Sequence, residues 1–263
     1  MITEKAIHEL VVDPEFKNLI RPLFKQEYLQ LEQNLISDGC RDPLTTWHGV
    51  IIDGHNRYEL CRKHQIPFSV EEMEFECKEE VIAWICANQL GRRNLTEETR
   101  KYLIGMQYES EKIVNSKKNA LGINQYVGQD STVSEERVDS EPLKRVVPTR
   151  VKTAMRIAEA NHISHGTVEK YAIYSRALDE LGKKDKEIVS KILSGRYKIS
   201  HNHVLELSKM TPSQIRQFCE QMENSQQPFV QYNQVRQTIT QMNSVPRHAP
   251  PVSYTHLTLP TIR

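Results

Sequence analysis

The sequence predicts an α+β protein in which an N-terminal α/β domain precedes an all-helical domain. In the first 90 residues, short apolar runs alternate with helical patterns, whereas the pattern is helical from Lys152 to about Met222. Charge divides the chain in the same way. Residues 1–90 contain 16 Asp/Glu and 9 Lys/Arg, and the remainder contains 18 acids and 26 bases. This asymmetry favours a polyanionic partner for the second half.

Bulk composition excludes several classes of protein. A chain of 263 residues with 38% hydrophobic and 26% charged residues is long enough for one large or two small soluble domains. No apolar run reaches the roughly 18 residues of a membrane span, and the acidic N-terminus lacks the apolar segment of a secretory signal. The five cysteines have no metal-type spacing, which predicts reduced thiols and a cytoplasmic location.

The N-terminal part begins with alternating elements. Ile7–Val12 is a predicted strand, and Tyr28–Ser37 is a predicted helix that Gly39 ends. Leu44–Trp47 and Val50–Ile52 are predicted strands joined by a tight turn.

A second group of elements follows this turn. Arg57–His64 is predicted to be helical and Pro67–Glu74 to be a strand, and two apolar helices follow at Glu79–Leu90 and Thr96–Lys118. Thr96 is the expected N-cap of the last of these. The predicted divisions are an α/β domain (1–90), a helical connector (91–118), a flexible linker (119–142), a helical domain (143–222), a low-pattern tail (223–251) and residues 252–263.

The last residues, VSYTHLTLPTIR, resemble the translation of a sequencing adaptor and follow a proline-rich stretch. We therefore leave Val252–Arg263 out of the fold reasoning and expect the natural C-terminus to be missing.

The stretch Thr153–Tyr174 reads TAMRIAEANHISHGTVEKYAIY and fits a helix-turn-helix. Ala158 is the small residue at which two helices touch, and Ser164 is placed to cap the second helix. In the turn, Asn161 tolerates a left-handed backbone better than most residues. Apolar anchors are predicted at Ile157, Ile163, Val168 and Tyr171.

An ordinary helical hairpin would show the same apolar pattern. Residues 144–176 contain 7 Lys/Arg and 2 acids, and this charge favours a helix-turn-helix that binds DNA. The expected base or phosphate contacts come from the second helix, and the backbone contacts come from basic residues around it. The candidate DNA-binding residues are Lys152, Arg156, Ser164, His165, Thr167, Lys170 and Arg176.

The stretch Val50–Phe68, VIIDGHNRYELCRKHQIPF, places an anion-binding pattern at a strand-to-helix turn. Gly54 lets the backbone approach a ligand closely, and the following helix N-terminus offers free N–H groups. Arg57 adds a planar fork for phosphate oxygens.

Together with ANQLGRRNLTEETRKYLIG and LSGRYKISHNHVLEL, this stretch resembles the ParB N-terminal fold, which sulfiredoxin shares, followed by a helix-turn-helix. The resemblance covers about residues 1–215 and implies a ParB/sulfiredoxin-like domain. In that family the first motif binds the phosphates of CTP with Mg²⁺, and the second motif supplies an asparagine. The nucleotide- or phosphate-binding residues implied here are Gly54, His55, Asn56, Arg57, Asn88, Arg92 and Arg93.

Two departures from the family pattern bear on this implication. The family's GERR is Gly54-His55-Asn56-Arg57 here, and Ala87 stands where the family has an acid before the asparagine. His55 also stands where sulfiredoxin has its nucleophilic cysteine, which argues against sulfinic reductase chemistry.

The favoured interpretation is a non-enzymatic, ParB-like DNA-binding protein of partitioning or transcription regulation, of bacterial, plasmid or mobile-element type. Its expected partners are double-stranded DNA, a second copy of the chain and a partition ATPase, and its expected location is at the nucleoid or a plasmid. Two alternatives stay open. One is a CTP-dependent DNA clamp, and the other is a phosphotransferase or nuclease in which Asp53 or Glu59 would serve as the carboxylate.

Overall fold

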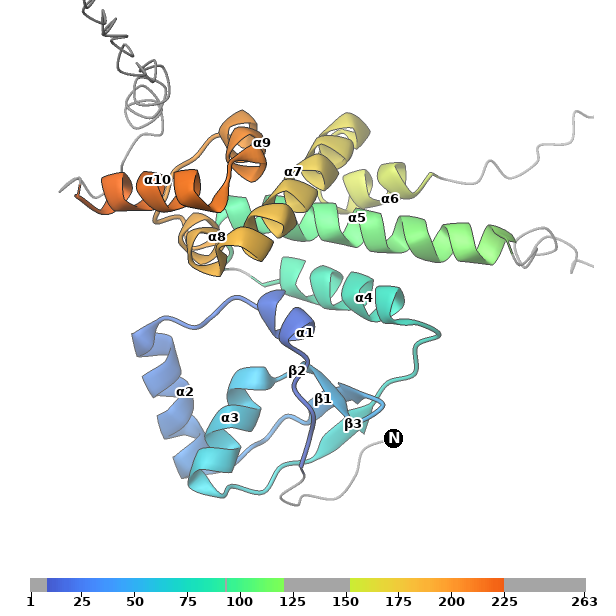
Figure 1. Ribbon diagram of the computed structural model, residues 1–263. Coiled ribbons are helices and arrows are strands. Elements are labelled where there is room, and N and C mark those ends of the chain that lie inside the picture. Colours follow the sequence, from blue (N-terminus) through green and yellow to red (C-terminus); the bar gives the residue numbers. More distant parts are fainter. Residues whose placement is uncertain (1–8, 93, 121–151, 225–263) are drawn as a thin grey trace, which may run out of the picture.

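The computed structural model describes residues 9–92, 94–120 and 152–224 (Figure 1). Its N-terminal part contains three short strands and three helices. These are α1 (Pro14–Asn18), α2 (Lys25–Asp38), β1 (Leu44–Trp47), β2 (Val50–Asp53), α3 (His55–His64) and β3 (Val70–Glu72).

The sheet has the order β2-β1-β3. The pair β1 and β2 is antiparallel and turns through His48 and Gly49, which both have positive φ. Such a turn matches the twist of a hairpin. Strands β1 and β3 are parallel, so α3 forms the crossover between them.

Seven further helices follow the sheet. They are α4 (Lys78–Leu90), α5 (Glu97–Ala120), α6 (Thr153–Ala160), α7 (His165–Lys184), α8 (Lys186–Leu193), α9 (His201–Lys209) and α10 (Pro212–Asn224). In Figure 1, α4 lies between the sheet and α5, while α6 and α7 cross α5 and α8–α10 gather around its N-terminal end. Among the described residues, no helix has the length and apolar character that crossing a membrane requires.

Most predicted elements are confirmed, with shifted ends. The strands at residues 44–47 and 50–52 are present, and the helix expected at 57–64 begins two residues earlier, at His55. The strand expected over 67–74 shrinks to Val70–Glu72. Of the strand expected at 7–12, Val11 forms an isolated parallel bridge with Val50, and residues 7 and 8 lie outside the described residues. Helix α1, capped by Asp13, was not predicted.

In the second half, α5 extends two residues into the predicted linker, to Ala120. The rest of that linker lies outside the described residues, as do residues 225–263. Thr96 caps α5 by accepting from the Thr99 backbone N–H, as the sequence predicts. Ser200 caps α9 and so makes His201 a helix start.

The main hydrophobic core joins the two halves of the chain. One cluster of buried residues extends from Phe16 in α1 through Ile52 in β2 and Leu103 in α5 to Met222 in α10. A smaller cluster, which includes Leu44 and Phe68, fills the space between the sheet, α2 and α3. The predicted domain boundary at residue 90 falls between α4 and α5, inside the layer that the main core holds together.

Gly105 sets the closest approach between α5 and α7. A Cβ at this position would lie 2.6 Å from the Tyr171 carbonyl carbon and 2.7 Å from Ser175 Oγ. Because the nearest atoms include the backbone of a neighbouring helix, no side-chain rotation relieves the clash. The two helices therefore pack this closely only while residue 105 has no side chain.

We expect Gly105→Ala to lower the free energy of unfolding by about 2 kcal/mol or more, because overpacking a tight helix contact costs about 1–3 kcal/mol. Urea unfolding followed by circular dichroism measures the change. Gly166→Ala is the matched control. It also replaces a helical glycine, but its Cβ meets open space, so its higher helix propensity should stabilise by roughly 0.5–1 kcal/mol. Equal effects of the two substitutions would contradict the packing account.

Candidate functional site

The strand-to-helix turn after β2 depends on Gly54. This residue is left-handed, with φ of 92° and ψ of 18°, and it is the N-cap of α3. A Cβ here would lie 2.5 Å from Leu44 Cδ2 and 3.1 Å from Arg57 Nη2. Only glycine satisfies both the backbone conformation and the packing, and the turn brings the Arg57 side chain back over the end of β2.

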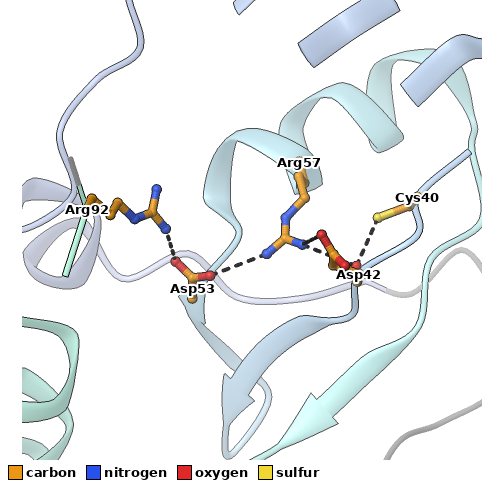
Figure 2. A network of polar contacts seen from close by, with 5 residues as sticks. All are labelled: Cys40, Asp42, Asp53, Arg57 and Arg92. Atoms are coloured by element: carbon orange, nitrogen blue, oxygen red, sulfur yellow. Dashed lines mark hydrogen bonds and ion pairs between the residues drawn. The ribbon is translucent and has the colours of Figure 1, made fainter. Parts of the chain in front are cut away.

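Two of the predicted phosphate-binding arginines meet at this turn, and a carboxylate lies between them (Figure 2). Asp53 accepts from Arg92 Nη2 at 2.8 Å and from Arg57 Nη2 at 3.3 Å. Arg57 Nη1 donates to the Asp42 backbone carbonyl at 3.3 Å and lies 3.5 Å from the Asp42 carboxylate. We call Asp42, Asp53, Arg57 and Arg92 the Asp53 cluster.

The charges of the Asp53 cluster cancel. The Asp53 side chain is only 14% exposed and that of Arg57 20%, so water screens this contact less than a surface ion pair. An incoming phosphate would compete with Asp53 for both guanidinium groups. The arrangement is a neutral bridge between β2, α3 and the segment after α4.

His55, another predicted ligand residue, faces the interior. Its side chain is buried, and neither ring nitrogen has a hydrogen-bond partner among the described residues. Burial lowers the pKa of His55 to about 4, and the nearby carboxylate of Asp53 only partly offsets this. The imidazole is therefore neutral near pH 7 and adds no positive charge to the turn.

The remaining predicted ligand residues are more scattered. Asn56 is half-buried on the first turn of α3, and Asn88 is exposed on the last turn of α4. Within the described part of the chain, no hydrogen bond joins either amide to the Asp53 cluster. Arg93 lies outside the described residues.

The second candidate site is the pair of helices α6 and α7. Ser164 caps α7 as predicted, because its Oγ accepts from the Thr167 N–H. The left-handed residue of the turn is His162, with φ of 55°, and not Asn161, which has φ of −107°. Asn161 instead donates its side-chain amide to the Ile157 carbonyl at 3.0 Å, which holds it in the helix-ending conformation.

The predicted anchors of this helix pair gather in one apolar cluster. Ala158, Ile157 and Val168 are buried against Ile104 of α5. Ile163 and Tyr171 pack around them. Helix α5 is thus the base on which both α6 and α7 rest.

The predicted DNA-binding side chains differ in their availability. Lys152, His165 and Lys170 are exposed. Thr167 is half-buried, and its hydroxyl is within 2.8 Å of Ser164 Oγ. Arg156 pairs with Glu111, and Arg176 lies 3.9 Å from Glu109.

Carboxylates of α5 offset part of the positive charge that favoured a DNA-binding helix-turn-helix. Three of the seven bases between 144 and 176 lie outside the described residues, namely Lys144, Arg145 and Arg150. Two more, Arg156 and Arg176, are paired with carboxylates of α5. Sequence reasoning missed Glu109 and Glu111, because no local spacing links them to arginines about 45 to 67 residues away in a helical bundle.

Comparisons with known proteins give structural similarity alone. No family model and no curated protein matches the chain. One solved structure, the C2221 form of a pNOB8-like ParB N-domain, is similar at 17% identity and a TM-score of 0.45, covering 91% of this chain and 98% of that chain. Another structure of the pNOB8-like ParB N-domain is similar at 16% identity and a TM-score of 0.43, covering 94% and 97%.

The buried His55 predicts a pH dependence of stability. Its pKa is about 4 in the folded chain and 6.5 as its ordinary value, so the unfolded chain binds more protons between these values. Stability is then full above pH 6.5 and falls towards pH 4, by roughly 3 kcal/mol at 1.36 kcal/mol per pKa unit.

Replacing His55 by leucine should flatten this part of the stability profile, measured by urea unfolding at several pH values. The control is His165→Leu, which removes an exposed histidine. An unchanged slope between pH 6.5 and 4 in His55→Leu would show that His55 is not the group responsible.

Proposed function

We propose that the chain is a non-enzymatic, ParB-like DNA-binding protein of the partitioning or regulatory type, and that α7 reads duplex DNA. The observation that carries the proposal is the division of α7 into two faces. Val168 and Ala172 are buried, whereas His165 and Lys170 project from the N-terminal half of the helix. A recognition helix contacts base edges from this part.

The capped turn supports the same proposal. The Ser164 cap ends the turn and fixes where α7 begins, and the apolar cluster around Ala158 holds α6 against it. A reader of DNA needs this rigidity, because its side chains have to match base edges within hydrogen-bonding distance.

The expected electrostatic role of Lys170 gives a direct test. Binding of a short duplex is measured by fluorescence anisotropy over a range of salt concentrations. If Lys170 contacts a phosphate, Lys170→Ala should weaken binding and reduce the slope of log K against log salt by about one. Lys183→Ala is the matched control, since Lys183 is exposed near the other end of α7 and pairs with Glu180.

Absence of DNA binding by the unmodified chain at low ionic strength would overturn the proposal. Equal salt slopes for Lys170→Ala and Lys183→Ala would remove α7 from the interface.

The Asp53 cluster supports a structural role and not nucleotide binding. Among the described residues, the only carboxylates beside Arg57 and Arg92 are those of Asp42 and Asp53, and Asp53 already accepts from both arginines. A magnesium-bound triphosphate needs oxygen ligands for the metal and free cations for the phosphates. The residues present do not fit that group.

We therefore expect no saturable binding of CTP with Mg²⁺ to the unmodified chain in isothermal titration calorimetry. Asp53→Asn removes the competing charge, so any anion affinity of the two arginines should appear in this variant first. The control is Asp38→Asn, which removes an acid that pairs with Arg41 away from the cluster. Micromolar CTP binding by the unmodified chain would show that the clamp alternative is correct.

The phosphotransferase or nuclease alternative is not supported by the same geometry. Asp53 lies between two guanidinium groups, with Arg92 Nη2 at 2.8 Å and Arg57 Nη2 at 3.3 Å. Glu59 is exposed on α3 near Lys17, at 3.7 Å, and near the Tyr28 hydroxyl, at 3.3 Å. Both carboxylates thus already contact side chains of the chain itself, which is the arrangement of structural ion pairs and hydrogen bonds.

A further inference from the structure

Arg156, a basic side chain of α6 and a candidate contact to the DNA backbone, is held by an acid of the supporting helix α5. Arg156 Nη2 donates to Glu111 Oε2. The arginine side chain is 56% exposed, whereas that of Glu111 is 16% exposed. The carboxylate is thus the fixed member of the pair, and the guanidinium is the member that solvent and ligands reach.

A second contact fixes Glu111 in place. The Gln107 side chain, one helical turn earlier on α5, is buried and donates its amide to Glu111 Oε1 at 2.9 Å. One carboxylate oxygen is therefore bonded to α5 itself, and the other accepts from Arg156. This arrangement presents one acceptor oxygen to α6 in a constant position.

The pair lies in a space that a phosphate can enter. Glu111 and Arg156 both line an open groove of about 840 Å³ between α4, α5, α6 and α7. Lys112 and Lys152 line the same groove, together with the acids Glu80 and Glu169, so Arg156 has two further cations beside it in the groove where a phosphate would enter. A phosphate oxygen and a carboxylate oxygen are equivalent acceptors for a guanidinium.

We propose, on the basis of the proposed function, that Glu111 is a positioning residue that holds Arg156 in the free protein and lowers its affinity for DNA. On binding, a backbone phosphate takes the place of the carboxylate as the acceptor for Arg156. The carboxylate stays bonded to Gln107. The Arg156–Glu111 ion pair is thus exchanged for an ion pair between Arg156 and a DNA phosphate. The contribution of Arg156 to DNA affinity is the difference in free energy between these two pairs.

The proposal predicts that Glu111→Gln binds DNA more tightly than the unmodified chain. An exposed ion pair contributes up to about 1 kcal/mol, which corresponds to an increase in affinity of up to about five-fold. The glutamine keeps an acceptor oxygen for Gln107, so α5 is little disturbed. Binding to a short duplex is measured at low salt by fluorescence anisotropy with the full chain.

Removing any acid near DNA strengthens binding, because it removes a long-range repulsion between a carboxylate and the DNA phosphates. The control must therefore remove the same charge without releasing an arginine from an ion pair. Glu159→Gln serves here, because Glu159 is exposed on α6 one turn after Arg156. A larger effect of Glu111→Gln than of Glu159→Gln supports the proposal. Equal effects overturn it.

A double-mutant cycle identifies the partner. In an Arg156→Ala background, Glu111→Gln should act no more strongly than Glu159→Gln, because no arginine is left to release. A persistent extra gain would show that Glu111 acts on DNA without Arg156 and would overturn the proposal. If the unmodified chain does not bind DNA, the proposed function fails. If it binds and the cycle shows no coupling, this inference alone fails.

Discussion

The contact of α5 with α7 at Gly105 is the constraint on which the rest of the structure depends. Helix α5 packs against α4 on one side and carries α6 and α7 on the other (Figure 1). Because Gly105 has no side chain, α7 approaches α5 until the Tyr171 carbonyl lies over the glycine. This close packing buries Ile104 against Ala158 and Val168, and so places the exposed face of α7 towards solvent. The helix pair α6 and α7, which we propose binds DNA, therefore rests on α5, and α5 also packs against α4 of the N-terminal half.

In both candidate sites, arginines form ion pairs with carboxylates of the same chain. At the Gly54 turn, Asp53 joins Arg57 and Arg92 and so ties the sheet to the segment between α4 and α5. On α6, Glu111 pairs with Arg156. In each case an arginine that the sequence marks as a phosphate ligand has an internal acceptor. An anion therefore binds only where it is a better acceptor than the carboxylate, and the count of basic residues overstates the available charge.

The sequence was sufficient for features that depend on local chemistry. The tight turn at His48-Gly49 and the Ser164 cap follow from residue types at fixed spacing, and the apolar anchors of α6 and α7 follow from helical periodicity. It was insufficient where distant residues meet. Nothing local reveals that Glu111 faces Arg156, that His55 is buried, or that α5 belongs to the main core as well as connecting the halves. The left-handed position of the turn was wrongly assigned to Asn161, because asparagine has the higher left-handed propensity. The side-chain amide of Asn161 instead donates a hydrogen bond to the Ile157 carbonyl, and His162 has the positive φ.

The most direct test of this account asks whether the two halves unfold together. The two tryptophans, Trp47 and Trp84, pack against the N-terminal side of the main core, so their fluorescence follows that half. Circular dichroism at the helical band mainly follows α5–α10. If α5 joins both halves through one core, the urea transitions from the two probes will coincide in midpoint and steepness. Two separate transitions would contradict the account, because the helical half would then be stable without the sheet.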